Sequence, residues 1–187
     1  MAVRLMMRVI GGRYRGLRLS APRGRGTRPP TGRVRESIFS ALGERAKEAD
    51  VLDLYAGSGS FGIEALSRGG RSAVFVERRR QAVAALRSNL DAVGAGDSAE
   101  VFSSSVESYL AVPDDGRRFN IVFADPPWDI SSEDVAGMLE KVSGLMTRGA
   151  VAVVTRRASD DVPAAPGLAI EDRRRHGDTQ IIRYLKE

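Results

Sequence analysis

The tetrapeptide Asp125-Pro126-Pro127-Trp128 combines residue types that suit chemistry on an exocyclic amine. The prolines stiffen the turn and remove backbone donors, which leaves carbonyl oxygens as acceptors. A nucleobase amine has two N–H groups and a delocalised lone pair that is a poor nucleophile. The Asp125 carboxylate and the Pro126 carbonyl can accept both hydrogens and turn the nitrogen toward an electrophilic methyl group. Trp128 offers a face on which an extruded base can stack, worth roughly 1–3 kcal/mol.

We therefore predict four catalytic residues for amine methylation: Asp125, Pro126, Pro127 and Trp128. The alternative is a purely structural role, because prolines make plain turns and a tryptophan is often a core aromatic. All four residues follow directly on the apolar run 119–124, so they stand at the exit of a predicted strand. That position favours the catalytic interpretation.

A second motif, residues 51–62, is typical of a nucleotide-binding corner. The apolar run at its start suits a buried parallel strand, and Gly57-Ser58-Gly59 then allows a sharp turn and close backbone approach to a ligand. The glycines at positions 57, 59 and 62 also match the G-x-G-x-x-G dinucleotide fingerprint, which by itself would favour a dehydrogenase. A dehydrogenase has no use for the Asp125 tetrapeptide, so we prefer a methyl-donor cofactor.

Several side chains near this corner are candidates for binding the cofactor. Asp53 lies in the strand end, where a carboxylate can anchor the polar end of a ligand, and Glu77 ends the next strand, where it can accept both ribose hydroxyls. Ser105 and Val106 can border an adenine ring. The alternative is a solvated acid at position 77 and ordinary turn serines. The full predicted cofactor set is Asp53, Tyr55, Gly57, Ser58, Gly59, Phe61, Glu77, Ser105, Val106 and Asp125.

Composition narrows the function classes further. The 187 residues suit one domain, with 42% hydrophobic and 28% charged residues. There is no cysteine and one histidine, His176, which excludes disulfides, thiolate zinc sites and a cysteine nucleophile. We expect no metal. No apolar run approaches the length of a membrane span, so we expect a cytoplasmic protein without a membrane partner.

The net charge of +5 is distributed unevenly along the chain. Residues 1–35 contain ten arginines and no acid, whereas the remaining residues contain 19 basic and 24 acidic side chains. This segregation indicates contact with nucleic-acid phosphates. The alternative is a solvated face in an organism that prefers arginine, since only three residues are lysines. The predicted nucleic-acid contacts are Arg4, Arg8, Arg13, Arg15, Arg18, Arg23, Arg25, Arg28, Thr31, Arg33 and Arg35.

The elements that must position these residues alternate between strand and helix. We predict an N-terminal hairpin from strands at 8–12 and 17–19, a loop at 21–30, and a helix at 32–46 that Thr31 caps. Further strands are predicted at 51–55, 72–76, 100–102, 119–124 and 150–155, with a closing antiparallel pair at 168–173 and 179–185. The remaining helices are predicted at 59–68, 79–93, around Val106 to Leu110, and from Ser131 or Ser132 to Gly144.

Such alternation predicts an α/β fold with a mostly parallel, seven-stranded sheet and helices on both faces. We divide the chain into a basic N-terminal extension, residues 1–30, and a catalytic domain, residues 31–187. If strands 51–55 and 119–124 are neighbours, their exits lie roughly 5 Å apart. The glycine loop and Asp125 would then face each other across one crevice.

The quoted motifs resemble a known class of enzyme. Asp53-x-x-x-Gly57-Ser58-Gly59, Glu77 and the Asp125 tetrapeptide are similar to S-adenosylmethionine-dependent amino-methyltransferases, which carry (Asn/Asp/Ser)-Pro-Pro-(aromatic). Nearly the whole chain resembles bacterial 16S rRNA guanine-N2 methyltransferases of the small-subunit "methyltransferase D" type, through the segments 8–12, 28–36, 53–59 and 177–179. In three places the chain departs from that pattern, at Trp128 instead of Phe or Tyr, at Pro30 and Gly32 around Thr31, and at the serines that end the strand 100–102.

This resemblance implies a Rossmann-like methyltransferase fold and S-adenosylmethionine as cofactor. It also implies methylation of N2 of a guanine in 16S rRNA, guanine 966, within a 30S assembly intermediate that contains ribosomal proteins. The predicted arginine contacts would then be RNA contacts. Two alternatives stay open: methylation of adenine N6 or cytosine N4 in DNA or RNA, and a non-catalytic RNA-binding assembly factor on the same scaffold.

Overall fold

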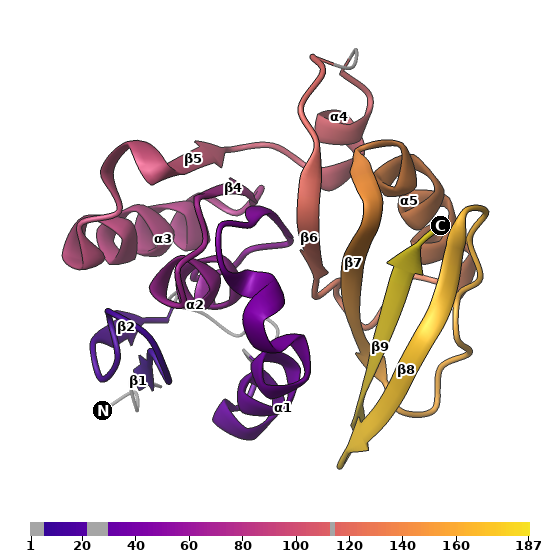
Figure 1. Cartoon of the computed structure of the whole chain (residues 1–187), viewed down its shortest axis with the longest axis horizontal. Helices are drawn as coiled ribbons and strands as arrows, with labels where there is room; N and C mark the ends of the chain where they lie inside the picture. Colours follow the sequence, from indigo (N-terminus) through magenta and orange to yellow (C-terminus); the bar gives the residue numbers. More distant parts are fainter. Residues whose placement is uncertain (1–5, 22–29, 113–114) are drawn as a thin grey trace.

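A computed structural model describes residues 6–21, 30–112 and 115–187. The predicted nucleic-acid contacts Arg4, Arg23, Arg25 and Arg28 lie outside these residues. In the described part of the chain, a seven-stranded sheet is flanked by helices, and a two-stranded hairpin lies beside it (Figure 1). No helix in that part is long and apolar enough to cross a membrane.

The strand order in the sheet is β5-β4-β3-β6-β7-β9-β8. The strands are β3 (Asp50–Leu54), β4 (Ser72–Val76), β5 (Ala99–Phe102), β6 (Phe119–Ala124), β7 (Met146–Arg157), β8 (Leu168–His176) and β9 (Thr179–Lys186). The five strands from β5 to β7 pair in parallel, and β9 and β8 continue the sheet in antiparallel pairing. The predicted mostly parallel sheet and its closing antiparallel pair are confirmed.

Helices cover both faces of the sheet because its central strands are apolar on both sides. The helices are α1 (Gly32–Leu42), α2 (Ser60–Ser67), α3 (Arg80–Val93), α4 (Val106–Leu110) and α5 (Ser132–Gly144), with 3-10 turns η1 (Gly43–Ala46) and η2 (Gly96–Ser98). Val51 packs in one buried cluster with α1, α2 and α3, whereas Leu52 and Leu54 pack in another with α4 and α5. This alternation is the period-2 pattern of a strand that is buried on both faces.

Side-chain caps begin two of the helices that lead into the site. The Thr31 hydroxyl accepts a hydrogen bond from Val34 N at 3.3 Å, and the Ser131 hydroxyl accepts one from Asp134 N at 3.0 Å. Each cap satisfies a backbone donor that the first turn of a helix leaves free. The predicted helix 32–46 is α1 followed by η1, because Gly43 adopts φ +53° and ends the α-helix.

The N-terminal hairpin forms as predicted, but its first strand is shifted. It consists of β1 (Met6–Arg8) and β2 (Arg18–Ser20), so the prediction of a strand at 8–12 was wrong beyond Arg8. The reason is that the backbone N–H groups of Ile10 and Gly11 donate to the Glu64 carboxylate on α2, each at 2.8 Å, instead of joining a strand ladder. The turn therefore docks on the main fold rather than extending the hairpin.

This docking makes the hairpin part of the main core. Met7, Val9 and Leu19 are buried in the same cluster as the apolar faces of α1, α2 and α3. Gly12 sits at φ +75°, and a Cβ there would lie 1.8 Å from the carbonyl oxygen of Ser67. That close approach needs glycine. The division of the chain at residue 30 stays a prediction.

Candidate functional site

The predicted crevice lies where β3 and β6 end side by side. Leu54 pairs with Ala124 in parallel register, so the loop after β3 and the Asp125 tetrapeptide leave the sheet at one edge. A cleft of about 650 Å³ opens there. Its lining residues are Tyr55, Val76, Glu77, Arg78, Arg79, Ser104, Ser105, Val106, Glu107, Asp125, Pro127, Trp128, Asp129, Ile130 and Arg157. A volume of this size suits a nucleoside-sized ligand.

Half of the predicted cofactor set lines this cleft. The lining members are Tyr55, Glu77, Ser105, Val106 and Asp125. The members that do not line it are Asp53, Gly57, Ser58, Gly59 and Phe61, and the predicted catalytic residue Pro126 is also absent from the lining. The structure therefore separates residues that face the cleft from residues that shape the loop beside it.

Asp53 belongs to the second group. Its buried carboxylate accepts a hydrogen bond from Gly62 N, in the first turn of α2, at 2.9 Å. Burial raises the pKa of Asp53 well above its ordinary value, and the charges of Asp125 and Glu77 raise it further, against the lowering effect of the Gly62 hydrogen bond. Asp53 thus fastens the start of α2 to β3. The expectation that it directly anchors a ligand is not what its contacts show.

Phe61 also belongs to the residues that position the glycine loop. Its ring stacks on Phe123 of β6, with 5.2 Å between the centroids. Gly62 lies against β4, where a Cβ would meet the Phe75 ring at 2.3 Å. Close packing of the helix on the sheet requires this glycine. Both contacts hold α2 against the strands that carry the site.

We expect Gly59→Ala to lower the free energy of unfolding by about 3 kcal/mol. Gly59 has φ +79°, which costs a residue with a Cβ about 1–2 kcal/mol, and the new Cβ would lie 2.3 Å from Leu86 Cδ1. Gly94→Ala is the matched control, because its φ is +64° but nothing lies within 4 Å of its Cβ. Urea unfolding should show a loss of about 1 kcal/mol for the control. Equal losses would contradict a packing role for Gly59.

Glu77 connects the glycine loop to the start of α3. One carboxylate oxygen accepts Gly57 N at 2.8 Å, and the other accepts Arg79 N at 2.8 Å and pairs with Arg79 Nε at 3.3 Å. The side chain is buried at the wall of the cleft. It is therefore not a freely solvated acid, and its carboxyl group lies at the position expected for ribose recognition.

A buried amide side chain also connects the N-terminal hairpin to the glycine loop. Asn89 on α3 is buried, and its Nδ2 donates to the carbonyl oxygens of Ser20 at 3.0 Å and Ser58 at 2.9 Å. Its Oδ1 accepts Ser20 N at 2.8 Å. One side chain thus joins the end of β2 to the glycine loop. Asn89 could not be identified from the sequence, because one amide in an amphipathic helix carries no distinguishing signal.

Asp125 projects into the cleft at the exit of β6. The Thr155 hydroxyl, at the end of β7, donates to one of its carboxylate oxygens. Burial raises the pKa of Asp125 to about 6, and the Thr155 hydrogen bond partly opposes that rise. Among the described residues no other side chain donates to Asp125, so the carboxylate keeps acceptor capacity toward the cleft.

Trp128 is not a core residue, because 43% of its surface is exposed while it lines the cleft. The Arg157 guanidinium lies over its ring, 5.2 Å from the centroid. Such a cation–π contact holds the indole in place and leaves part of it available for stacking. Thr155 and Arg157 were missed from the sequence, because the pairing of β7 with β6 that brings them to the cleft was not predicted.

Tyr55 follows β3 in a conformation that is rare for its residue type. Its φ is +58°, which is strained for a side chain with a Cβ. Burial raises its pKa to about 12, so its hydroxyl stays protonated. Strain of this kind often accompanies a functional constraint, and here it aims Tyr55 at the cleft wall.

The described N-terminal arginines divide into exposed and buried. Arg8, Arg13, Arg15, Arg18 and Arg33 are exposed, and Thr31 is exposed at the start of α1.

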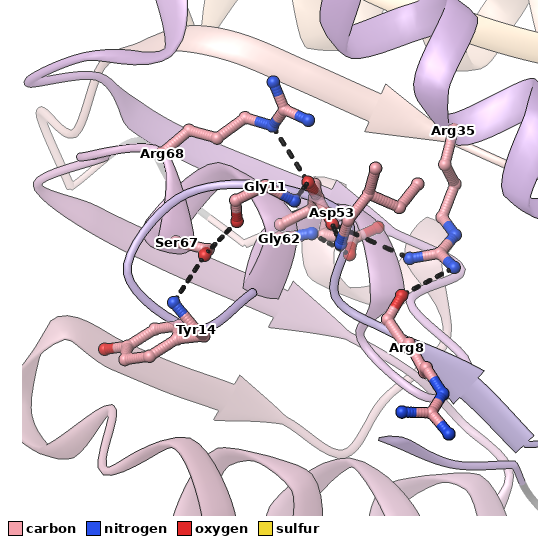
Figure 2. Close-up of polar contacts among 10 residues, drawn as sticks. Arg8, Gly11, Tyr14, Arg35, Asp53, Gly62, Ser67 and Arg68 are labelled. Atoms are coloured by element: carbon pink, nitrogen blue, oxygen red, sulfur yellow. Dashed lines mark hydrogen bonds and ion pairs between the residues drawn. The ribbon is translucent and has the colours of Figure 1, made fainter. Parts of the chain in front are cut away.

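Arg35 is the exception, and the prediction that it contacts nucleic acid was wrong. It is 3% exposed, donates to the carbonyl oxygen of Arg8 at 2.9 Å and lies 3.8 Å from the Glu64 carboxylate (Figure 2). Burial lowers the pKa of Arg35, and the Glu64 charge opposes that shift. Arg35 holds the hairpin to α2 rather than facing solvent.

Figure 2 shows the rest of this junction between the hairpin turn and α2. Tyr14 N donates to the Ser67 hydroxyl at 2.9 Å, and that hydroxyl donates to the Gly11 carbonyl. Arg68 Nε pairs with the Glu64 carboxylate at 2.9 Å. The basic extension is therefore attached to the helix whose first turn forms the edge of the glycine loop.

Comparison with known proteins agrees with this geometry. The family model described as Conserved hypothetical protein 95 matches residues 7–185. Ribosomal RNA small subunit methyltransferase D of Escherichia coli (strain K12) is 38% identical over 161 residues, which cover 86% of this chain and 79% of that protein. The chain belongs to this methyltransferase family.

Other relatives extend the match. The family member of the same name from Haemophilus influenzae is 34% identical over 131 residues, covering 70% of this chain and 68% of that protein. The solved structure of yhhF from Escherichia coli has a TM-score of 0.85 at 35% identity and covers 97% of this chain and 98% of its own. The Rossmann-like fold predicted for the family is confirmed. Among the described residues, no group of three or more His, Asp or Glu side chains is arranged to hold a metal ion.

Proposed function

We propose that this S-adenosylmethionine-dependent rRNA methyltransferase transfers a methyl group to the exocyclic N2 of a guanine in 16S rRNA, guanine 966, during small-subunit assembly. The observation that carries the proposal is the position of Asp125. Its carboxylate stands at the exit of β6, in the same cleft as Glu77 and Trp128. An acceptor for an amine, an acid for a ribose and an aromatic face for a base therefore share one cavity.

The residues present fit S-adenosylmethionine. Glu77 is held rigidly by two backbone N–H groups and can accept ribose hydroxyls, while Ser105 and Val106 border the position for adenine. The glycine loop lies beside the cleft wall, because Gly57 N donates to Glu77. When bound, S-adenosylmethionine supplies a methyl group bonded to a positively charged sulfur, which is the electrophile.

The chain's own part is to orient the guanine amine. The Asp125 carboxylate and the Pro126 carbonyl accept the two N2 hydrogens, so the nitrogen lone pair points along the line of methyl transfer. Transfer of the methyl group would form the bond from N2 to carbon as the carbon–sulfur bond of the cofactor breaks, and N2 would then give up one proton. Asp125 has a pKa of about 6, so at neutral pH it is ionised and can receive that proton.

RNA binding rests on the exposed arginines of the extension and the start of α1. Arg8, Arg13, Arg15, Arg18 and Arg33 offer charge and paired N–H donors to phosphates. We propose 16S rRNA in a 30S assembly intermediate with ribosomal proteins as the partner, and the cytoplasm as the location. The deciding experiment incubates the protein with methyl-labelled S-adenosylmethionine and small subunits from cells that lack the endogenous activity.

Nucleoside analysis of the labelled RNA then gives the answer. Label in N2-methylguanosine supports the proposal. Label in N6-methyladenosine or N4-methylcytidine would replace the guanine with another exocyclic amine. No label in any substrate form, with demonstrated cofactor binding, would reject a catalytic role and favour a binding factor.

We expect Trp128→Ala to raise the KM for RNA by about tenfold to a hundredfold. Loss of base stacking removes roughly 1–3 kcal/mol of binding, whereas the cofactor contacts are untouched. Trp128→Phe is the control, because it keeps an aromatic face and should stay within about threefold of the wild type. Steady-state kinetics with the RNA substrate measures both. An unchanged KM for Trp128→Ala would show that Trp128 does not stack on the RNA base.

A further inference from the structure

We infer that the tip of the β8–β9 hairpin, at the sheet edge that carries the catalytic cleft, is a second RNA-contacting surface. The inference rests on the proposed function and extends its RNA contacts to residues far from the N-terminal arginines. The residues that form this surface, the hairpin-tip surface, are Arg157, Arg173 and Arg175.

Strand pairing brings the tip to the edge of the site. Arg157, at the end of β7, pairs with Thr179 of β9, and Thr179 pairs with His176 of β8. Because β7 leaves the sheet at the same edge as β6, the hairpin turn lies at the edge that carries Asp125. Arg157 itself lines the cleft and covers the Trp128 ring. The hairpin-tip surface is thus continuous with the proposed base-stacking site.

The charges of the hairpin leave a positive surplus at this end. Glu171 pairs with Arg45 and Arg183, and Asp172 pairs with Arg174, so these acids are already neutralised. The consequence is that acids within β8 do not offset its two remaining arginines.

Arg173 and Arg175 are both exposed. Within residues 6–21, 30–112 and 115–187, no carboxylate forms an ion pair with either one, and Arg175 uses only Nε, toward the Gly177 carbonyl at 3.0 Å. The remaining acid at the tip is Asp178. Arg157, Arg173 and Arg175 therefore outnumber Asp178, the acid in the turn between β8 and β9.

The tip also touches the element that continues the N-terminal basic segment. His176 Nε2 lies 3.0 Å from the Ser37 hydroxyl on α1. Arg33 precedes Ser37 by four residues, so it lies about one helical turn, roughly 5–6 Å, along the same face. Figure 1 shows the ends of β8 and α1 along the lower edge of the molecule, with β1 and β2 beyond α1. The hairpin tip therefore packs beside the helix that carries Arg33, while Arg173 and Arg175 alternate with His176 and project from the other face of β8.

A polyanion is the partner that this arrangement suits. Guanidinium groups bind phosphate oxygens through paired N–H donors, and several of them near a cleft can hold the strand that flanks an extruded base. A different explanation is that β8, as the edge strand, uses charge to prevent pairing with another sheet. That explanation predicts no effect on RNA binding.

The test is the double variant Arg173→Gln/Arg175→Gln, assayed with the RNA that the wild type methylates. The control Lys141→Gln/Arg148→Gln removes two exposed cations near the end of α5 and the start of β7, at the opposite edge of the sheet. We expect the tip variant to raise the RNA Kd about tenfold. The slope of log Kd against log salt should fall by about 1.4, at roughly 0.7 for each single-strand phosphate contact.

The control variant should leave both quantities unchanged, and both variants should bind S-adenosylmethionine and melt like the wild type. Unchanged RNA affinity for the tip variant, or an equal loss in both variants, would overturn the inference. A wild type that methylates no RNA would overturn the proposed function instead. The two failures are therefore distinguishable in one set of measurements.

Discussion

Asp125→Ala lowers the kcat for methyl transfer by about a hundredfold to a thousandfold, while the Kd for S-adenosylmethionine stays within about threefold. The substitution removes the acceptor that orients the guanine amine, and a hydrogen bond to a charged group together with lost orientation is worth about 3–4 kcal/mol. The cofactor contacts of Glu77 and the glycine loop do not depend on this side chain. Single-turnover methylation and calorimetric cofactor binding measure the two effects separately.

Asp125→Asn is the matched control, because its amide oxygen keeps one acceptor without the charge. We expect a loss of about tenfold. The wild-type kcat should fall as the pH drops below about 6, since protonation of Asp125 replaces an acceptor with a donor. The Asn variant should lack that fall. An Asp125→Ala enzyme with unchanged kcat would reject the proposed mechanism.

Glu64→Leu lowers the free energy of unfolding by about 4 kcal/mol. Glu64 is 0% exposed, and its carboxylate accepts the N–H groups of Ile10 and Gly11 while facing Arg35. The substitution leaves a buried guanidinium unpaired, which typically costs 3–5 kcal/mol. Urea unfolding measures the loss, and limited proteolysis reports whether the hairpin turn detaches first.

Two further variants separate the causes of that loss. Glu64→Leu/Arg35→Met removes both buried charges, so it should recover part of the stability that the single variant loses. Arg68→Ala removes the partner at the protein surface and should cost about 1 kcal/mol. A loss below about 1 kcal/mol for Glu64→Leu would contradict the role of Glu64 in docking the hairpin.

Much of the fold was accessible from the sequence, because buried parallel strands and amphipathic helices have different periods. The strands 72–76 and 119–124 match β4 and β6 residue for residue. The strand predicted at 150–155 is longer, spanning Met146–Arg157, because antiparallel pairing with β9 continues it to Arg157 and pairing with Phe119 of β6 begins it at Met146. The ends of a strand depend on pairing partners that are distant in sequence, and the local pattern of apolar residues does not reveal those partners.

The candidate site was predictable where residue type alone limits the chemistry. Asp125 and Trp128 meet in one cleft with Glu77, as the spacing indicated. The roles of Asp53 and Arg35 were not predictable, because an acid in a strand end and an arginine in a basic segment have the same composition signal whether they face a ligand or the interior. The structural role of Glu64 was not predictable either, because the sequence does not show whether an acid on a helix faces solvent or the interior. Its burial depends on a hairpin more than fifty residues away.

Asn89 uses both of its amide hydrogens and its oxygen to join Ser20 to Ser58. Two of its three hydrogen bonds go to Ser20, so a chain that lacks β2 leaves one N–H group and the oxygen of this buried amide without those partners. Truncating the first 30 residues would strip the arginines and at the same time orphan this buried amide beside the glycine loop. The extension is consequently not modular, and deletion cannot separate RNA affinity from cofactor-loop geometry. Point substitutions of the exposed arginines are the way to separate them.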